Sequence, residues 1–271
     1  MSIFEAILIA VVEGITEFLP ISSTGHMIIA SSMLGIHKKE FTKLFEVAIQ
    51  FGAILAVVVL YRKKFFDFRR KEFYFKLLVG VIPALALGLL FSEKIDKLLE
   101  SPLTVAISLL VGGIVLLFID RAFRKPLVQS DEQLTYSKSF LIGCWQIISM
   151  IPGVSRSAAS IIGGMQQKLT RNFAAEFSFF LAVPTMFAAC FYSLFLKEWP
   201  LSQKKGYQII LESSENLTAF FIGNMVAFVV AMLAIRFFIN YLKIYGFRFF
   251  GWYRVLAGII LLIIILSGSI E

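Results

Sequence analysis

The chain has 271 residues, of which 58% are apolar and only 16% are charged, and its net charge is +8. Soluble domains carry about 25% charged residues, so this composition excludes a water-soluble globular domain, whose surface would be largely apolar. In a membrane protein the basic excess belongs in loops beside the spans, and no nucleic-acid partner is expected.

The first apolar segment, residues 3–35, differs from a simple membrane span. Pro20 and the polar run Ile21-Ser22-Ser23-Thr24-Gly25 interrupt it near its middle. Proline removes a helical hydrogen bond and clashes with the preceding turn, and the hydroxyls that follow suit the start of a new helix. The segment therefore predicts a helix–loop–helix hairpin that enters the membrane and returns to the same side.

Apolar runs bounded by charged residues predict six membrane spans further along the chain. They lie near residues 45–61, 77–92, 103–119, 174–196, 218–240 and 252–268. A second broken segment, residues 139–165, falls between the third and fourth spans and is divided by Pro152-Gly153-Val154-Ser155-Arg156-Ser157. By the same reasoning it predicts a second re-entrant hairpin.

The order of these elements repeats. Residues 1–125 and residues 137–271 each hold a hairpin followed by three spans, and Glu17-Phe18-Leu19-Pro20-Ile21-Ser22 parallels Ser149-Met150-Ile151-Pro152-Gly153-Val154-Ser155. The expected fold is an all-α polytopic membrane protein made of two inverted repeats. Such repeats with broken helices place polar sites near the bilayer midplane, where the repeats meet.

Basic residues predict the orientation. One set of connections holds 17 of the 26 Lys and Arg residues: 62–76, 120–138, 163–173 and 236–254. The opposite loops, 36–46, 93–102 and 197–217, hold 8, and Arg156 is counted inside the membrane. The positive-inside rule makes the first set cytoplasmic, so both termini and the opening of the first hairpin face the outer side.

Four ionisable side chains are predicted at membrane depth, where such groups are costly and usually functional: Glu13, Glu17, His26 and Arg156. Glu13 and Glu17 share one helix face, and two close carboxylates require a proton, a cation or a basic partner such as His26. Plainer readings stay open: Glu13 reaching the headgroups, His26 bonding a backbone carbonyl, and each serine capping a helix.

Together these residues predict a site for a phosphorylated lipid. Two half-helices that begin near the midplane offer free N–H groups and positive dipole ends to an anion. Arg156 adds a forked cation that suits phosphate, while Glu, His and Ser supply acid–base and nucleophilic groups. Glu46, Gln50 and Glu176 are weaker candidates for the lining of the same cavity.

Residues 13–26, from Glu13-Gly14-Ile15-Thr16-Glu17 to Ser22-Ser23-Thr24-Gly25-His26, resemble the first signature of the undecaprenyl-diphosphate phosphatase family, also called bacitracin-resistance proteins. Residues 152–157 resemble the second signature. The similarity covers the whole chain, including both hairpins. One departure is Ser160, where a threonine is common in the family.

The resemblance implies hydrolysis of undecaprenyl diphosphate to undecaprenyl phosphate and phosphate, at the plasma membrane of a bacterium. That reaction recycles the lipid carrier for cell-wall synthesis and confers bacitracin resistance. It implies catalytic roles for Ser23, His26, Glu17 and Arg156, and a divalent cation, Mg²⁺ or Ca²⁺, at Glu13 and Glu17. The expected phosphate ligands are Ser22, Thr24, Gly25, Gly153, Ser155, Arg156 and Ser157.

The expected mechanism is in-line phosphoryl transfer to Ser23, with His26, oriented by Glu17, as the base and Arg156 neutralising charge. Attack by His26 or by an activated water is left open, as is a homodimer. The rival function is a transporter or flippase for a phosphorylated polyprenyl lipid, because inverted repeats are a transporter architecture. A carrier needs the arginine and the helix dipoles but has no use for a Ser–His–Glu group.

Overall fold

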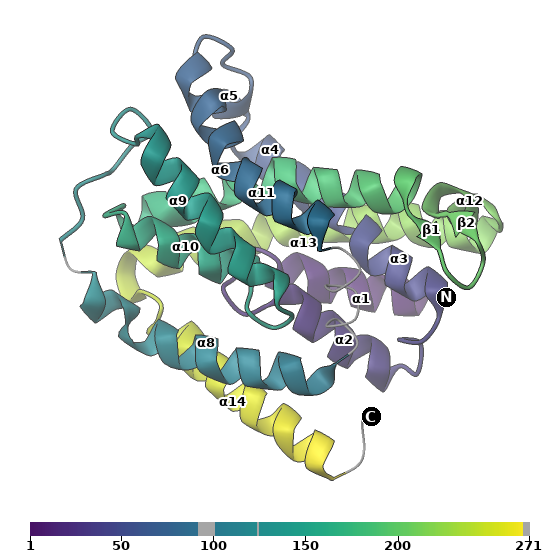
Figure 1. Cartoon of the computed structure of the whole chain (residues 1–271). Coiled ribbons are helices and arrows are strands. Elements are labelled where there is room, and N and C mark those ends of the chain that lie inside the picture. Colours follow the sequence, from purple (N-terminus) through teal and green to yellow (C-terminus); the bar gives the residue numbers. More distant parts are fainter. Residues whose placement is uncertain (92–100, 124, 268–271) are drawn as a thin grey trace. The chain divides into compact units, whose positions relative to one another are not determined.

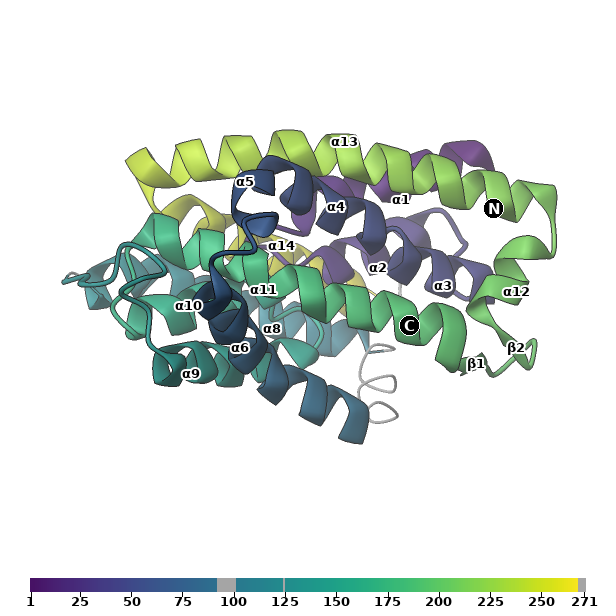
Figure 2. The same cartoon turned by 90° about the horizontal axis from the view of Figure 1, so that it is seen from above.

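The computed structural model describes residues 1–91, 101–123 and 125–267 (Figure 1). Helices dominate this part of the chain, and Figure 2 shows the longest of them, α13, as one unbroken rod. In chain order the elements are α1 (Ile3–Thr16), α2 (Ser23–Met33), α3 (Glu40–Ala48), α4 (Gln50–Leu60), α5 (Arg62–Phe65), α6 (Lys71–Leu90), α8 (Pro102–Ala122), α9 (Tyr136–Ile147), η1 (Ile148–Met150), α10 (Arg156–Gln166), α11 (Arg171–Phe191), η2 (Tyr192–Leu196), β1 (Glu198–Trp199), β2 (Lys204–Lys205), α12 (Gly206–Leu211), α13 (Ser214–Tyr245) and α14 (Arg248–Leu266).

Five stretches of helix are long and apolar enough to cross a membrane: Glu40–Leu60, Pro102–Ala122, Arg171–Leu196, Ser214–Tyr245 and Arg248–Leu266. They coincide with five of the six predicted spans, and the chain is a multi-pass membrane protein. The remaining span, near 77–92, falls on α6, although residue 92 lies outside the described residues. Residue 268, at the end of the last predicted span, lies outside them as well.

The first hairpin has the predicted helix break. Ser2 and Glu5 form a capping box that starts α1, because each side chain binds the other residue's backbone N–H. The helix ends at Thr16, four residues before Pro20, and α2 begins at Ser23 and packs against α1. The break at the proline is therefore confirmed.

The second hairpin is built in the same way. Thr135 caps α9, η1 continues it, and α10 begins at Arg156 after the Pro152 break. The Ser155 hydroxyl accepts a hydrogen bond from the N–H of Ala158 at 3.3 Å, which is the expected helix cap. Ser155 has φ 73° and Ser22 has φ 72°, so both loops place a left-handed serine directly before the second helix.

The helices form two compact units, and each unit draws on both halves of the sequence. Unit 1 contains Met1–Phe18, Ser23–Arg62 and Ala182–Ile235, and unit 2 contains Leu19–Ser22, Lys63–Leu181 and Arg236–Glu271. Neither unit matches residues 1–125 or residues 137–271. The boundaries of the two compact units therefore differ from those of the predicted repeats. The division into repeats stays a prediction.

Unit 1 has a core of apolar side chains from α1, α2, α3 and α13, together with Ile49 between α3 and α4. Its fully buried members include Ile9, Phe45 and Ala227. Where α4 meets α13, the Gly52 N–H donates to Oδ1 of Asn224 at 2.8 Å, and a methyl group on Gly52 would overlap the Asn224 backbone. Small residues let helix backbones approach this closely, as is common in membranes.

Unit 2 is organised around the antiparallel pair α8 and α14, which lie side by side in Figure 1. Gly113 and Gly251 face each other at this contact, and a methyl group on either would lie about 3 Å from the carbonyl oxygen of the other. Asp120 accepts a hydrogen bond from the N–H of Phe247 at 2.9 Å, just before α14 begins. The opposite sides of both helices expose large apolar residues, among them Val111, Phe118, Leu256 and Ile263, which suit contact with lipid.

Two regions used in the charge count contain more helix than a simple connection. The stretch 236–254 is mostly helical, because α13 continues to Tyr245 and α14 begins at Arg248. Arg254, which the charge count assigned to that stretch, is completely buried. The predicted loop 197–217 also contains regular secondary structure, namely the short β1–β2 hairpin and α12.

The left-handed backbone of Ser155 predicts an unusual ranking of two substitutions. Ser155→Ala loses the cap, about 1 kcal/mol, and keeps an unfavourable φ, whereas Ser155→Gly loses only a few tenths and relieves that strain. Gly should therefore be more stable than Ala by about 1 kcal/mol, or roughly 2–4 °C in the thermal unfolding of the solubilised protein. An alanine variant at least as stable as the glycine variant would contradict this account of the loop.

Candidate functional site

The two signature loops touch each other inside unit 2, although they are far apart in the sequence. The Ser157 hydroxyl donates to the carbonyl oxygen of Leu19 at 2.8 Å. A hydroxyl has one proton to donate, so the 3.0 Å hydrogen bond between Ser155 and Ser157 runs from Ser155 to Ser157. Both serine protons are thus used to hold the loops, and phosphate binding by these two residues stays a prediction.

Ser23, the predicted nucleophile, donates its proton to a buried carboxylate in unit 1. Its hydroxyl donates a hydrogen bond to Oε2 of Glu17, and both side chains are at least 93% buried. Glu13, one turn earlier on α1, is completely buried. The break at Pro20 reverses the chain and lets the start of α2 return to the end of α1, which brings the two groups together.

His26 follows Ser23 by three residues, in the first turn of α2, so the two side chains share one helix face. His26 and Thr24 are half-buried, while Gly25 between them is buried. The sequence suggested that Glu17 acts through His26, and the structure adds a direct hydrogen bond from Ser23 to Glu17. Glu17 is therefore a second candidate for the base.

Arg156 is the first residue of α10, and its side chain is hydrogen-bonded to α11. Its Nη1 donates to the carbonyl oxygen of Ser178 at 2.9 Å. Ser160 donates to the Arg156 carbonyl oxygen at 2.8 Å, so the 2.7 Å bond to Ser178 runs from Ser178 to Ser160. A threonine hydroxyl could make these same bonds, which explains why the departure at Ser160 leaves the helix start intact.

Two further predicted phosphate ligands, Ser22 and Gly153, lie in the loops before α2 and α10. Ser22 is buried and left-handed, and Gly153 has φ 89° with no room for a side chain, because a Cβ would lie 2.6 Å from the Val105 carbonyl oxygen. Ser22, Gly153, Ser155, Arg156 and Ser157 belong to unit 2, whereas Glu13, Glu17, Ser23, Thr24, Gly25 and His26 belong to unit 1. The structure thus shows two local clusters.

Glu176 has a simpler place than the cavity lining considered from sequence. It forms an ion pair with Lys64 at 3.0 Å, between α11 and α5. Its charge is satisfied there, which explains a carboxylate in the first turns of an apolar helix.

The described residues contain no group of three or more His, Cys, Asp and Glu side chains that could hold a metal ion. Glu13 and Glu17 supply two carboxylates from one face of α1. Mg²⁺ is commonly bound by one or two carboxylates together with substrate phosphates and water. The donor set therefore fits a cation that binds with a diphosphate, and it does not fit a cage made of protein groups alone.

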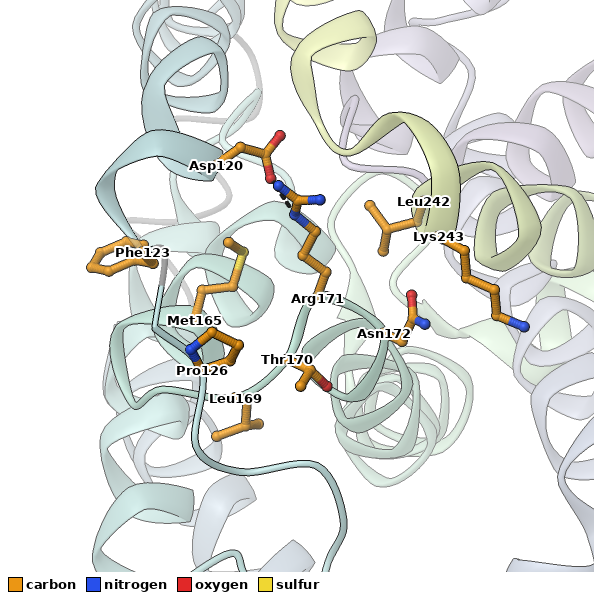
Figure 3. Close-up of a pocket in the computed structure, with 10 residues that line it drawn as sticks. All are labelled: Asp120, Phe123, Pro126, Met165, Leu169, Thr170, Arg171, Asn172, Leu242 and Lys243. Carbon is orange, nitrogen blue, oxygen red and sulfur yellow. Dashed lines mark ion pairs between the residues drawn. The ribbon is translucent and has the colours of Figure 1, made fainter.

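A cavity of about 400 Å³ lies elsewhere in unit 2, at the start of α11 (Figure 3). Arg171 crosses it and binds Asp120 at 2.6 Å, the carboxylate that also accepts from Phe247. None of the predicted site residues lines this cavity. The ion pair between Asp120 and Arg171 joins α8 to α11. We therefore interpret these two charged groups of the cavity as a structural contact.

Sequence reasoning missed one residue that contacts both loops. Arg254 donates to the carbonyl oxygens of Pro20, at 3.1 Å, and of Val154, at 2.9 Å. The available signal was a basic residue inside the predicted span 252–268, but Arg254 was counted with the basic residues of the stretch 236–254. Arg254 is thus a completely buried ionisable residue that the sequence analysis did not single out.

Comparisons with known proteins agree with these signatures. The family model described as bacitracin resistance protein BacA matches residues 6–260. An undecaprenyl-diphosphatase of Flavobacterium psychrophilum is 58% identical over 264 residues, which cover 97% of this chain and 96% of the relative. Undecaprenyl-diphosphatases of Porphyromonas gingivalis and Bdellovibrio bacteriovorus are each 48% identical, over 99% of this chain and 98% of the relative. The chain belongs to the bacitracin resistance protein family.

Proposed function

We propose that this protein is an integral membrane phosphatase that hydrolyses undecaprenyl diphosphate to undecaprenyl phosphate and inorganic phosphate. The observation that carries the proposal is the buried hydrogen bond from the Ser23 hydroxyl to Glu17, inside the first signature. A hydroxyl that is hydrogen-bonded to a carboxylate can pass its proton to that carboxylate as it attacks. Relatives that carry the name undecaprenyl-diphosphatase identify the substrate.

The reaction has two balanced steps. The Ser23 oxygen attacks the terminal phosphorus, the bond from that phosphorus to the bridging oxygen breaks, and lipid monophosphate leaves. The proton of Ser23 passes to Glu17, with His26 as the alternative acceptor on the same face of α2. Water then attacks the phosphorus of the phosphoserine, and the bond from phosphorus to the Ser23 oxygen breaks. The Ser23 oxygen takes its proton back from the base, and both protons of the water leave with the phosphate.

Arg156 neutralises charge on the phosphoryl oxygens during transfer, since little else is required of the protein in this chemistry. The Ser178 carbonyl oxygen orients its guanidinium, and the N-terminal amides of α10 lie beside it. Glu13 and Glu17 would hold a divalent cation, Mg²⁺ or Ca²⁺, together with the bound diphosphate. Such a cation would offset the negative charge that the substrate brings to the two carboxylates.

The chain is further proposed to consist of two inverted repeats, each with a re-entrant hairpin, in the bacterial plasma membrane. The matching left-handed serines at residues 22 and 155 support the repeat. The site opens to the outer side in this arrangement. Without Arg254 the basic residues number 16 against 8, which still favours that orientation. Return of the lipid by a flippase activity has no supporting observation.

Release of phosphate from a polyprenyl diphosphate by the purified protein tests the function and its base together. Glu17→Gln keeps an oxygen for the Ser23 hydrogen bond but cannot take its proton, so kcat should fall about 100-fold or more. Glu215→Gln, at an exposed carboxylate in the first turn of α13, is the control. No release by the unmodified protein would refute the function, and a fully active Glu17→Gln variant would make His26 the base.

Arg156 should be needed as a forked cation. Arg156→Ala should lower phosphate release about 100-fold or more. Arg156→Lys should recover little of it, because one ammonium cannot bind the Ser178 carbonyl oxygen and bridge two phosphate oxygens in the same geometry. Arg69→Ala, at a side chain that is 98% exposed, should release phosphate normally. Near-normal turnover of the lysine variant would reduce Arg156 to a point charge.

The orientation predicts which loops a membrane-impermeant thiol reagent reaches in intact spheroplasts. Cys144 and Cys190 are first replaced, and single cysteines are then placed at the exposed positions Lys39 and Arg69. The reagent should label position 39 and leave position 69 unlabelled until the membrane is opened. Arg69 serves better than Arg70, whose guanidinium is bound by Asp131. The reverse pattern would overturn an outward-facing site.

A further inference from the structure

Arg254 is a fully buried arginine whose hydrogen-bond partners in the structure are main-chain carbonyl oxygens. Nη1 donates to Pro20 and Val154, and Nη2 donates to Gly153 at 2.8 Å and Ser108 at 3.0 Å. Nε makes a longer contact, 3.5 Å, with Leu109. A buried charge is costly unless it is fully hydrogen-bonded, so this arrangement indicates a specific task.

Three of those carbonyl groups belong to the two signature loops. Pro20 lies in the loop before α2, and Gly153 and Val154 lie in the loop before α10. A single planar guanidinium therefore joins both loops to each other and, through Ser108, to α8. The hydrogen bond from Ser157 to Leu19 is a second link between the same two loops.

These bonds also determine how the loop peptides point. The chain has no cis peptide bonds among its described residues, and the C=O and N–H of a trans peptide point in opposite directions. Since Arg254 holds the Val154 carbonyl oxygen, the N–H of Ser155 is directed away from it. A left-handed serine persists only where its surroundings stabilise it, and Arg254 binds the residue directly before Ser155 and the residue two before Ser22.

Space for the guanidinium is provided by a glycine. A methyl group on Gly112 of α8 would overlap Nη2 of Arg254. The head group therefore lies directly on the α8 backbone. Gly258, one turn further along α14, lies at the same helix contact but faces Leu110 and Ala106.

We propose that Arg254 is a positioning residue, which holds the loop preceding Ser23 against the loop preceding Arg156 in the arrangement that the phosphoryl transfer needs. The proposal rests on the phosphatase function stated above. Arg254 touches loop carbonyl oxygens and acts through them. It supports the transition state by fixing these loops, so its loss should lower kcat far more than it raises KM.

The test compares three variants of the full-length solubilised protein, with rates expressed per folded molecule. Arg254→Met keeps the bulk of the side chain without the donors, and Gly112→Ala displaces the guanidinium without removing it. Gly258→Ala is the matched control, because it disturbs the same packing of α8 on α14 away from the guanidinium. Arg254→Met should lower kcat about 100-fold with KM within about threefold, Gly112→Ala should lower kcat at least about tenfold, and Gly258→Ala should keep both within about threefold.

Hydrogen exchange provides a readout that does not depend on activity. The N–H groups of Ile21 and Val154 are bonded within their loops, to Leu19 at 2.8 Å and Ile151 at 3.1 Å. Both should exchange faster in Arg254→Met and Gly112→Ala and be unchanged in Gly258→Ala. Should Arg254→Met fail to accumulate, Gly112→Ala, which retains the charge, decides the question.

The outcomes separate the two proposals. No phosphate release by the unmodified protein would refute the phosphatase function, whereas the exchange measurement would still test the link between the loops. Equal effects of Gly258→Ala and Arg254→Met, or loosening of only one loop, would make Arg254 a helix-packing residue. A kcat of Arg254→Met within about threefold of the unmodified value would also overturn the positioning role.

Discussion

Backbone groups inside a bilayer must find their partners within the protein, and the two broken hairpins meet this constraint with difficulty. Each proline break leaves carbonyl groups that no helix satisfies. Arg254 supplies donors to three of them, in the loops of Pro20 and of Gly153-Val154, and it does so from the middle of an apolar helix. One buried guanidinium thus makes two irregular loops compatible with a hydrophobic environment.

The packing of α8 against α14 follows from that guanidinium. Arg254 reaches the loops only because Gly112 leaves room for it on α8 and because Gly113 and Gly251 bring the two helices close together. Asp120 adds a bond to the N–H of Phe247 at one end of the pair. Small residues at these positions therefore serve the loops as well as the helix contact, and a larger side chain would disturb both.

Chemistry and structure use the same kind of group in this protein for different ends. Ser23 gives its proton to a carboxylate, which suits a nucleophile. Ser155 donates to Ser157, and Ser157 donates to the carbonyl oxygen of Leu19, which suits a link between loops. Ser178 donates to Ser160, and Ser160 donates to the carbonyl oxygen of Arg156. Only the partner of each hydroxyl distinguishes these uses, since the residues themselves are alike.

Composition, apolar runs and proline breaks were sufficient to determine the membrane class, five of the six predicted spans and both helix breaks, because these depend on neighbours in the sequence. The signature residues were recognisable for the same reason. The hydroxyls after each proline also predicted a helix cap, which Ser155 forms.

The tertiary structure alone decided which polar groups meet. Folding brings together Ser23 and Glu17, which are hydrogen-bonded, and likewise Ser157 and Leu19. It also places Arg254 where its side chain donates to carbonyl oxygens of both loops. In the sequence, Arg254 was counted as one more basic residue of the stretch 236–254, although it also lay inside the predicted span 252–268. Burial and partners of a side chain depend on how helices pack, and that packing depends on glycines whose neighbours lie far away along the chain.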